Sequence, residues 1–141
     1  MPPKSKSSAA IRTNRILFLA IAIVGCATDL LTKHWVFAWR GMPRPKNEWW
    51  LWEPYVGVET SLNRGALFGM GETIGPTGFA VISIIAGLAF CWWGLFGSAS
   101  KHRTLSVTLG AILGGIGGNL YDRLGLWSGG EVLAVRDWIL L

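Results

Sequence analysis

The sequence predicts an all-α membrane protein with three transmembrane helices and a small extracytoplasmic loop that contains strands. Hydrophobic residues make up 51% of the 141 residues and charged residues only 15%, whereas a water-soluble domain carries about 25% charged residues. Nineteen glycines and nine tryptophans fit this class, because Gly is common in transmembrane helices and Trp gathers at the membrane interface. Three apolar runs each approach the roughly 20 residues that one crossing needs. The length leaves room for a single domain.

The first half of the chain contains one predicted span and one loop. Residues 1–15 are basic and contain no acid, which predicts a disordered cytoplasmic arm. The first span is predicted at 16–39, and it reaches a sufficient length only if it includes the polar patch at Asp29. Residues 40–75 combine Pro, Trp and mixed charge with short alternating stretches, which indicate strands in a periplasmic loop on the membrane surface.

The second half contains two further predicted spans. Residues 76–97 are uncharged and form the second span, residues 98–103 form a basic cytoplasmic turn, and residues 104–121 form a Gly-rich third span. Residues 122–141 are polar again and are predicted to be periplasmic. Their last four residues, 138–141, are apolar, so we expect them to begin a fourth span that is missing from the chain.

The distribution of Lys and Arg predicts the orientation, because cytoplasmic loops carry an excess of both. The arm has four basic residues and the 98–103 turn has two, without any acid, whereas the 40–75 loop has four of each sign and the tail has two basic residues against three acids. The N-terminus is therefore predicted to be cytoplasmic. The net charge of +5 follows from this placement beside an anionic leaflet, so no nucleic-acid partner is expected.

The two cysteines give no metal or redox signal. Cys26 and Cys91 lie in apolar runs without metal-ligand spacing, so we expect no metal and no cofactor. An alternative is that the basic arm, a 12-residue apolar core and residues 23–26 (Ile-Val-Gly-Cys) form a lipoprotein signal. The two apolar runs that follow argue against a secreted lipoprotein.

Ionisable residues at membrane depth are candidates for function because they are costly to insert. Asp29 and Lys33 are four residues apart with the acid first, the favourable order for an ion pair on a helix. Two interpretations remain open for them: a self-satisfied pair at a helix end, or a direct role in chemistry. Asn63 precedes Gly65, and this pattern is typical either of a surface turn or of a platform for an extended peptide.

The third span predicts close helix packing and carries a polar cluster. Gly110, Gly114 and Gly118 recur every four residues, so they line one helix face and allow a neighbouring helix to approach. Three polar residues at the outward end lie three and four positions apart and can point the same way. They are Asn119, Asp122 and Arg123.

Asp137 is the remaining candidate. It lies between apolar and aromatic neighbours on the outward side, where a carboxyl group is a candidate general acid or base. His34 and His102 are predicted on opposite faces of the membrane, so no nucleophile–histidine set competes with it.

Together these blocks resemble the ordered motifs of bacterial lipoprotein signal peptidase, also called signal peptidase II, from about residue 13 to the end. The resemblance implies a four-helix aspartic peptidase of the inner membrane, with a strand-rich cradle on the periplasmic side. Its substrates would be diacylglyceryl-modified prolipoproteins in membrane lipid, cut just before the lipid-modified Cys. The matching blocks are Asp29-x-x-Thr32-Lys33, Asn63-x-Gly65-Ala66-x-Phe68-Gly69, Gly114-Gly115-x-x-Gly118-Asn119-x-x-Asp122-Arg123 and Val135-x-Asp137-Trp138.

The resemblance also implies a role for each site residue. Asp137 matches a catalytic aspartate. Substrate-binding positions are matched by Asn63, Asn119 and Arg123, and supporting positions by Asp29, Lys33 and Asp122.

One departure from the family leaves two functional hypotheses. The second catalytic aspartate is expected in an Asn-x-x-Asp block on a fourth helix, but the chain stops four residues after Asp137. The chain is therefore either a truncated form of an active peptidase, or an inactive membrane protein of the same family that still binds lipidated peptide. For the 141-residue chain by itself we expect no turnover, and poor stability unless it oligomerises.

Overall fold

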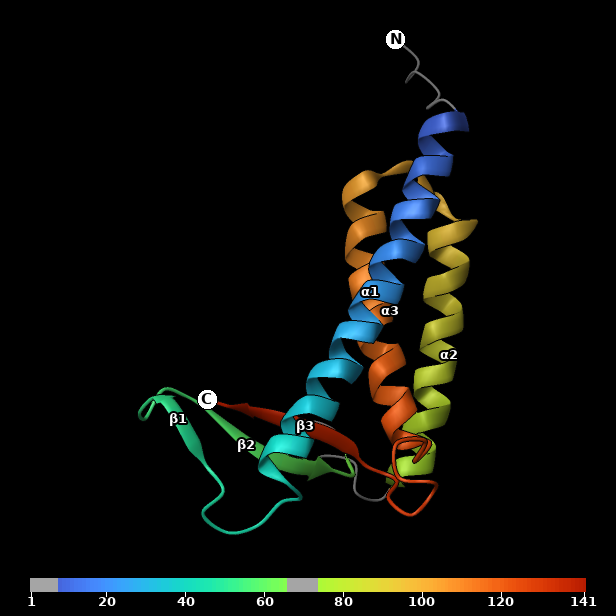
Figure 1. The fold of residues 1–141 in the computed structure, drawn as a ribbon. Coiled ribbons are helices and arrows are strands. Elements are labelled where there is room, and N and C mark those ends of the chain that lie inside the picture. Colours follow the sequence, from blue (N-terminus) through green and yellow to red (C-terminus); the bar gives the residue numbers. More distant parts are fainter. Residues whose placement is uncertain (1–7, 66–73) are drawn as a thin grey trace.

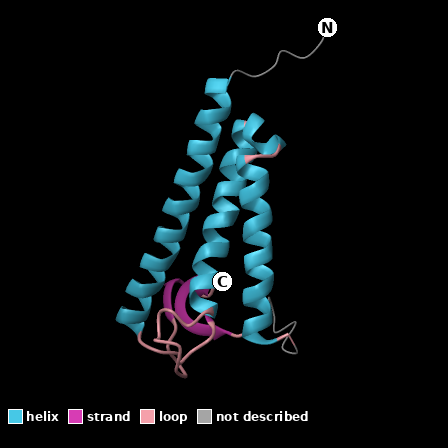
Figure 2. Cartoon of the chain, turned by 90° about the vertical axis from the view of Figure 1, so that its right-hand side faces the viewer, coloured by secondary structure: helices cyan, strands magenta, loops and turns pink. Residues whose placement is uncertain are grey.

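Three long helices lie side by side, and a three-stranded sheet lies across one end of them (Figures 1 and 2). This computed structural model describes residues 8–65 and 74–141. The N-terminal end of the first helix and the turn between the last two helices lie at the opposite end from the sheet (Figure 1). In chain order the elements are α1 (Ser8–Arg40), β1 (Trp49–Trp52), β2 (Val56–Asn63), α2 (Gly75–Leu95), the 3₁₀ helix η2 (Ser98–Lys101), α3 (Arg103–Arg123) and β3 (Val135–Leu140).

Two of the described helices are long and apolar enough to cross a membrane. They are α1 and the segment Gly75–Lys101, which contains α2. The third expected span, 104–121, is also helical within α3, but its glycines, serine and threonines leave it outside this class. The structure therefore contains two membrane-capable helices where the sequence predicted three spans.

Helix α1 begins earlier than expected. It starts at Ser8, so residues 8–15 of the predicted disordered arm are helical, and residues 1–7 lie outside the described part. No Gly or Pro interrupts residues 8–15, and the Nδ2 of the buried Asn14 donates a 2.9 Å hydrogen bond to the Ser100 carbonyl oxygen. This contact ties the first turns of α1 to η2.

The sheet is antiparallel with β2 in the centre, and its third strand corrects one expectation. Trp138, Ile139 and Leu140 were expected to begin a further span, but they lie in β3. A short apolar run does not by itself distinguish strand from helix. Here pairing with β2, more than 70 positions earlier, decides the outcome, and it places Asp137 opposite Ser61.

Helices α1 and α3 approach closely through the predicted glycine face. A Cβ atom at Gly114 would lie 2.9 Å from the Ala22 carbonyl oxygen, and one at Gly110 would lie 2.6 Å from the Phe18 carbonyl oxygen. The close packing expected from the four-residue repeat is confirmed. It brings the sheet end of α3 against the polar part of α1.

Large apolar side chains lie on the outer surface of the helices, and several polar side chains are buried between the helices. Ile23, Ile85 and Leu88 are each more than 60% exposed. Lys33 and Ser106, in contrast, are buried. This distribution is the reverse of that in a water-soluble bundle.

Candidate active site

Lys33 is the centre of a buried polar cluster that joins α1 to α3. Its Nζ lies 2.7 Å from the Oδ2 of Asp29 and donates a 2.9 Å hydrogen bond to the Oδ1 of Asn119. It also lies 3.3 Å from the Oδ2 of Asp122. Asp29 and Lys33 share a helix face at the i,i+4 spacing, and Asn119 and Asp122 share one at i,i+3. The predicted Asp29–Lys33 ion pair is present, and it is extended by two partners from α3.

Asp122 connects this cluster to the sheet. Its side chain is fully buried, and its two oxygens accept three hydrogen bonds from Arg136 of β3. The Nε and Nη2 of Arg136 donate to Oδ1 at 3.0 and 2.7 Å, and the backbone N–H of Arg136 donates to Oδ2 at 3.0 Å. Asp122 thus fixes β3 to the end of α3.

The charges balance within this cluster, in which Lys33, Asp122 and Arg136 are buried and Asp29 is half-buried. Asp29 and Asp122 carry two negative charges, and Lys33 and Arg136 carry two positive charges. A buried ion needs a partner and filled hydrogen-bonding positions, because desolvation costs several kcal/mol per ion. The four side chains are paired with one another, and removing one of them leaves an uncompensated charge.

A cavity of about 150 Å³ lies beside the cluster and contains the candidate catalytic residue. Asp137 on β3 lines it with Asp29 and Lys33 of α1 and Asn119 of α3. Arg136, Trp138 and Ile139 complete the lining. The structure thus brings four of the seven predicted site residues to one small cavity, and a fifth, Asp122, lies directly behind it.

Arg123 and Asn63 meet at a different point, the turn after β2. The Nη2 of Arg123 donates a 3.3 Å hydrogen bond to the Gly65 carbonyl oxygen, and the Gly65 N–H donates a 3.0 Å bond to the Oδ1 of Asn63. The turn predicted for the Asn-x-Gly pattern is confirmed. The remaining motif positions there, Ala66, Phe68 and Gly69, lie outside the described residues.

Arg123 also interacts electrostatically with Asp137. Its guanidinium carbon lies 5.3 Å from the ring centre of Phe79 on α2. Burial lowers the pKa of Arg123 below its usual value, and the negative charges of Asp137 and Asp122 oppose that shift. Arg123 therefore lies within the electrostatic reach of Asp137 without lining the same cavity.

Sequence reasoning assigned no role to Arg136, although it lies inside one of the quoted motif blocks. The available signal was Asp122 itself, because an acid at the end of a Gly-rich apolar helix needs a cation. Arg123 is adjacent to Asp122 in the sequence, but its Nη2 donates to the Gly65 carbonyl oxygen, and the cations that contact Asp122 are Lys33 and Arg136. The second cation came from a strand that was not predicted.

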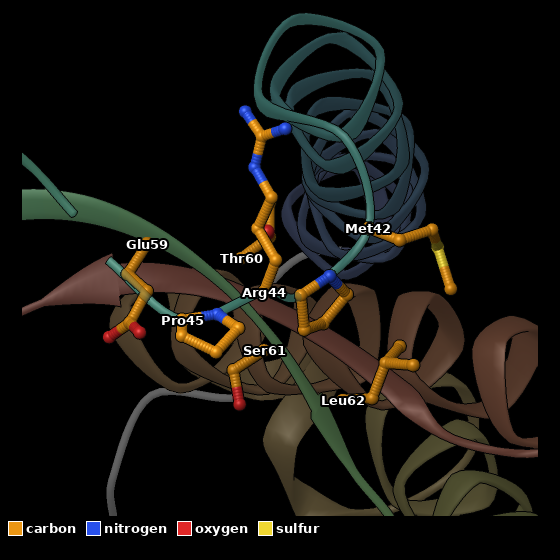
Figure 3. A pocket seen from close by; sticks show the side chains of 8 residues that line it. Met42, Arg44, Pro45, Glu59, Thr60, Ser61 and Leu62 are labelled. Atoms are coloured by element: carbon orange, nitrogen blue, oxygen red, sulfur yellow. The ribbon is translucent and has the colours of Figure 1, made fainter. Parts of the chain in front are cut away.

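A larger hollow of about 630 Å³ lies between residues 42–45 and β2 (Figure 3). Glu59 and Ser61 project toward it from β2, while the guanidinium of Arg44 extends away from both. None of the predicted site residues lines this hollow. The smaller cavity is therefore the candidate active site.

Across residues 8–65 and 74–141, no group of three or more His, Cys, Asp or Glu side chains is arranged to hold a metal ion.

Comparison with known proteins identifies the family. The family model described as Signal peptidase (SPase) II matches residues 21–141. The chain is 44% identical over 144 residues to a lipoprotein signal peptidase of Rhodopirellula baltica, and the match covers 98% of this chain. The chain spans 64% of the length of that curated relative. No solved structure matches the chain. Since the family model covers most of the chain, the protein belongs to the signal peptidase II family of proteases.

Proposed function

We propose that the protein is a membrane aspartic endopeptidase that removes signal peptides from prolipoproteins by cutting before the lipid-modified Cys. The observation that carries this proposal is the position of Asp137. It lines a small cavity, next to a charge-balanced polar cluster, at the sheet end of helices with apolar outer surfaces. The Rhodopirellula baltica relative is named for cleavage of the same substrate class.

The chemistry requires two carboxyl groups. Two carboxyls that share a site do not both ionise readily, so one keeps a proton while the other acts as a base. The ionised group takes a proton from water as the water oxygen attacks the carbonyl carbon of the scissile peptide bond. The protonated group then gives its proton to the leaving amide nitrogen, and the C–N bond breaks. Asp137 supplies one of the two groups in this proposal.

In the described part of the chain, the acids that line the cavity are Asp137 and Asp29. Asp29 is the other acid that lines it, but its Oδ2 lies 2.7 Å from the Nζ of Lys33. This ion pair favours a supporting role for Asp29. The family resemblance instead implies an Asn-x-x-Asp block on a further helix after Asp137.

The proposed topology has three helices crossing the inner membrane, with the N-terminus cytoplasmic and the cavity on the periplasmic side. Exposed apolar side chains on α1 and α2 support contact with lipid. Helix α3 packs along α1 through its glycine face, so we place it in the membrane as well. Basic residues support the orientation, because Arg12, Arg15, Lys101 and Arg103 lie at the end away from the sheet.

Substrate would approach at the sheet end of the bundle. We propose that Asn63, Asn119 and Arg123 bind the peptide near its lipidated Cys, since amide and guanidinium groups can donate to peptide carbonyl oxygens. Lys33 and Asp122 hold Asn119 and β3 in place through the contacts described above. No cofactor takes part in this chemistry.

The test is cleavage by the purified full-length gene product in detergent. A diacylglyceryl prolipoprotein should be cut so that the released product begins with the lipid-modified Cys, as read by mass spectrometry, and the same precursor without the lipid should be cut much more slowly. Absence of cleavage, or equal cleavage of both precursors, would contradict the proposal.

A further inference from the structure

Asp137 lies on β3, whose pairing with β2 contains one irregularity close to Asp137. In the described part of the chain, β3 pairs with β2 on one side, and this ladder is irregular between Val58 and Ser61. Because side chains alternate between the two faces of a strand, a slip of one residue would move every side chain of β3 to the other face. The Asp137 side chain would then change faces, and its carboxylate would lose its present position relative to Asp29, Lys33 and Asn119. The fold needs a second contact that sets this register.

The contact between Arg136 and Asp122 has the properties such a register lock requires. It uses both the backbone N–H and the guanidinium of the same residue, so it fixes the position of the strand as well as its side chain. The Asp122 carboxylate is 0% exposed and Arg136 is 4% exposed. Charge-assisted bonds that use two donors of a guanidinium are stronger and more directional than neutral bonds.

Two aromatic rings restrict the guanidinium further. Its carbon lies 5.0 Å from the ring centre of Trp127 and 5.9 Å from that of Phe37 on α1. Contacts of this length are in the range of cation–π attraction. Arg136 is thus held by α1, α3 and the segment before β3, independently of β2.

We infer that Arg136 is a positioning residue, whose lock on Asp122 sets the register of β3 and thereby directs Asp137 into the cavity. Consecutive side chains leave a strand on opposite faces. With the Arg136 guanidinium held against Trp127 and Asp122, the side chain of Asp137 leaves the strand on the opposite face, while both residues contribute to the cavity lining. The consequence for catalysis rests on the proposed function, but the register itself does not.

Paired cysteines measure the register directly. Val58 and Ile139 are opposite each other across β2 and β3, so Val58→Cys with Ile139→Cys should form a disulfide in the native register. The native Cys26 and Cys91 are replaced by Ala in all variants. Two companion variants pair Val58→Cys with Trp138→Cys or with Leu140→Cys, and these report a slip by one residue in either direction.

Arg136→Gln keeps the length and polarity of the side chain while it removes the charge and the two-donor bond. We expect the 58/139 disulfide to fall several-fold and a slipped pair to rise. Arg136→Lys keeps the charge but cannot reproduce the two-donor bond. It should give a smaller change in the same direction, so this variant tests the inference even if Arg136→Gln fails to fold. An unchanged 58/139 yield in either folded variant would overturn the inference.

Cleavage kinetics separate positioning from general destabilisation. These kinetics use the full-length protein in which Cys26 and Cys91 are replaced by Ala. There Arg136→Lys should lower kcat by up to about 10²-fold, as expected when a catalytic group is misplaced by about 1 Å, with KM nearly unchanged. Arg64→Gln removes an exposed charge beyond the end of β2 and should match the parent in disulfide yield and kcat. Asn14→Ala destabilises the opposite end of the bundle and should lower the melting temperature without changing kcat.

The two proposals fail in distinguishable ways. If an Arg136 variant loses the 58/139 disulfide and the parent protein cleaves no prolipoprotein, the result would contradict the proposed function alone. A retained disulfide in an Arg136 variant, with normal cleavage by the parent, would contradict the register lock alone.

Discussion

Lys33 on α1 donates a 2.9 Å hydrogen bond from its Nζ to the Oδ1 of Asn119 on α3, across 86 positions of the sequence. The same ammonium group also faces the carboxylates of Asp29 and Asp122. One buried cation therefore sets the position of a proposed substrate-binding amide and pairs with two acids, whose second positive charge comes from Arg136. This arrangement makes the polar end of the bundle a single cooperative unit.

Replacing Lys33 should be strongly destabilising. Lys33→Met keeps most of the side-chain volume but leaves Asp29 and Asp122 short of a cation, and breaking a buried ion pair from one side costs about 3 to 5 kcal/mol. Thermal unfolding in detergent measures the effect. Lys101→Met, at an exposed lysine of η2, is the control and should stay within about 0.5 kcal/mol of the parent. Equal melting temperatures for the two variants would argue against the buried cluster.

The glycine face of α3 provides a second comparison between two adjacent residues. A Cβ at Gly114 would meet backbone atoms of α1 at 2.9 and 3.0 Å, whereas one at Gly115 would meet no atom within 4 Å. Gly114→Ala should therefore destabilise by about 1 to 3 kcal/mol, the usual range for overpacking. Gly115→Ala should be neutral or stabilising by up to about 1 kcal/mol, because Ala favours a helix over Gly. The prediction fails if the two variants unfold at the same temperature.

Asn63 offers a way to separate a turn from a binding residue. Its Oδ1 accepts the Gly65 N–H, and Asp at this position can still accept that bond but has no N–H to donate. Asn63→Asp should keep the melting temperature of the parent and raise KM by about tenfold, as expected for one lost hydrogen bond to substrate of about 1.4 kcal/mol. An unchanged KM would restrict Asn63 to its role in the turn. Asn63→Ala, which loses both functions, should also unfold at a lower temperature.

The sequence predicted the helices well because their signals are local. Uncharged apolar runs placed α1 and α2, and the four-residue glycine repeat predicted which face of α3 packs against α1. The Asp29–Lys33 pair and the Asn63 turn were also accessible, since each involves residues within four positions. Interactions of this kind depend on spacing alone.

The parts that escaped prediction depend on distant partners. β3 was expected to begin a helix because Trp138, Ile139 and Leu140 are apolar, and only pairing with β2 makes them a strand. The role of Arg136 escaped prediction for the same reason. Its bond to Asp122 exists only when β3 crosses the end of α3. Basic composition predicts a disordered arm, but α1 starts at Ser8 because Asn14 in its first turns bonds to Ser100, a partner 86 positions away.

The most direct measurement is the rate of prolipoprotein cleavage by Asp137→Asn in the full-length protein, beside Glu131→Gln. Glu131 is an exposed acid six positions earlier in the same segment, so its replacement controls for the loss of one negative charge. Asp137→Asn keeps the size of the side chain but removes its proton chemistry, and it should reduce kcat by about 10²- to 10⁴-fold. Glu131→Gln should cleave at the parent rate. Cleavage by Asp137→Asn at a rate close to the parent's would contradict the assignment of Asp137 as a catalytic carboxylate.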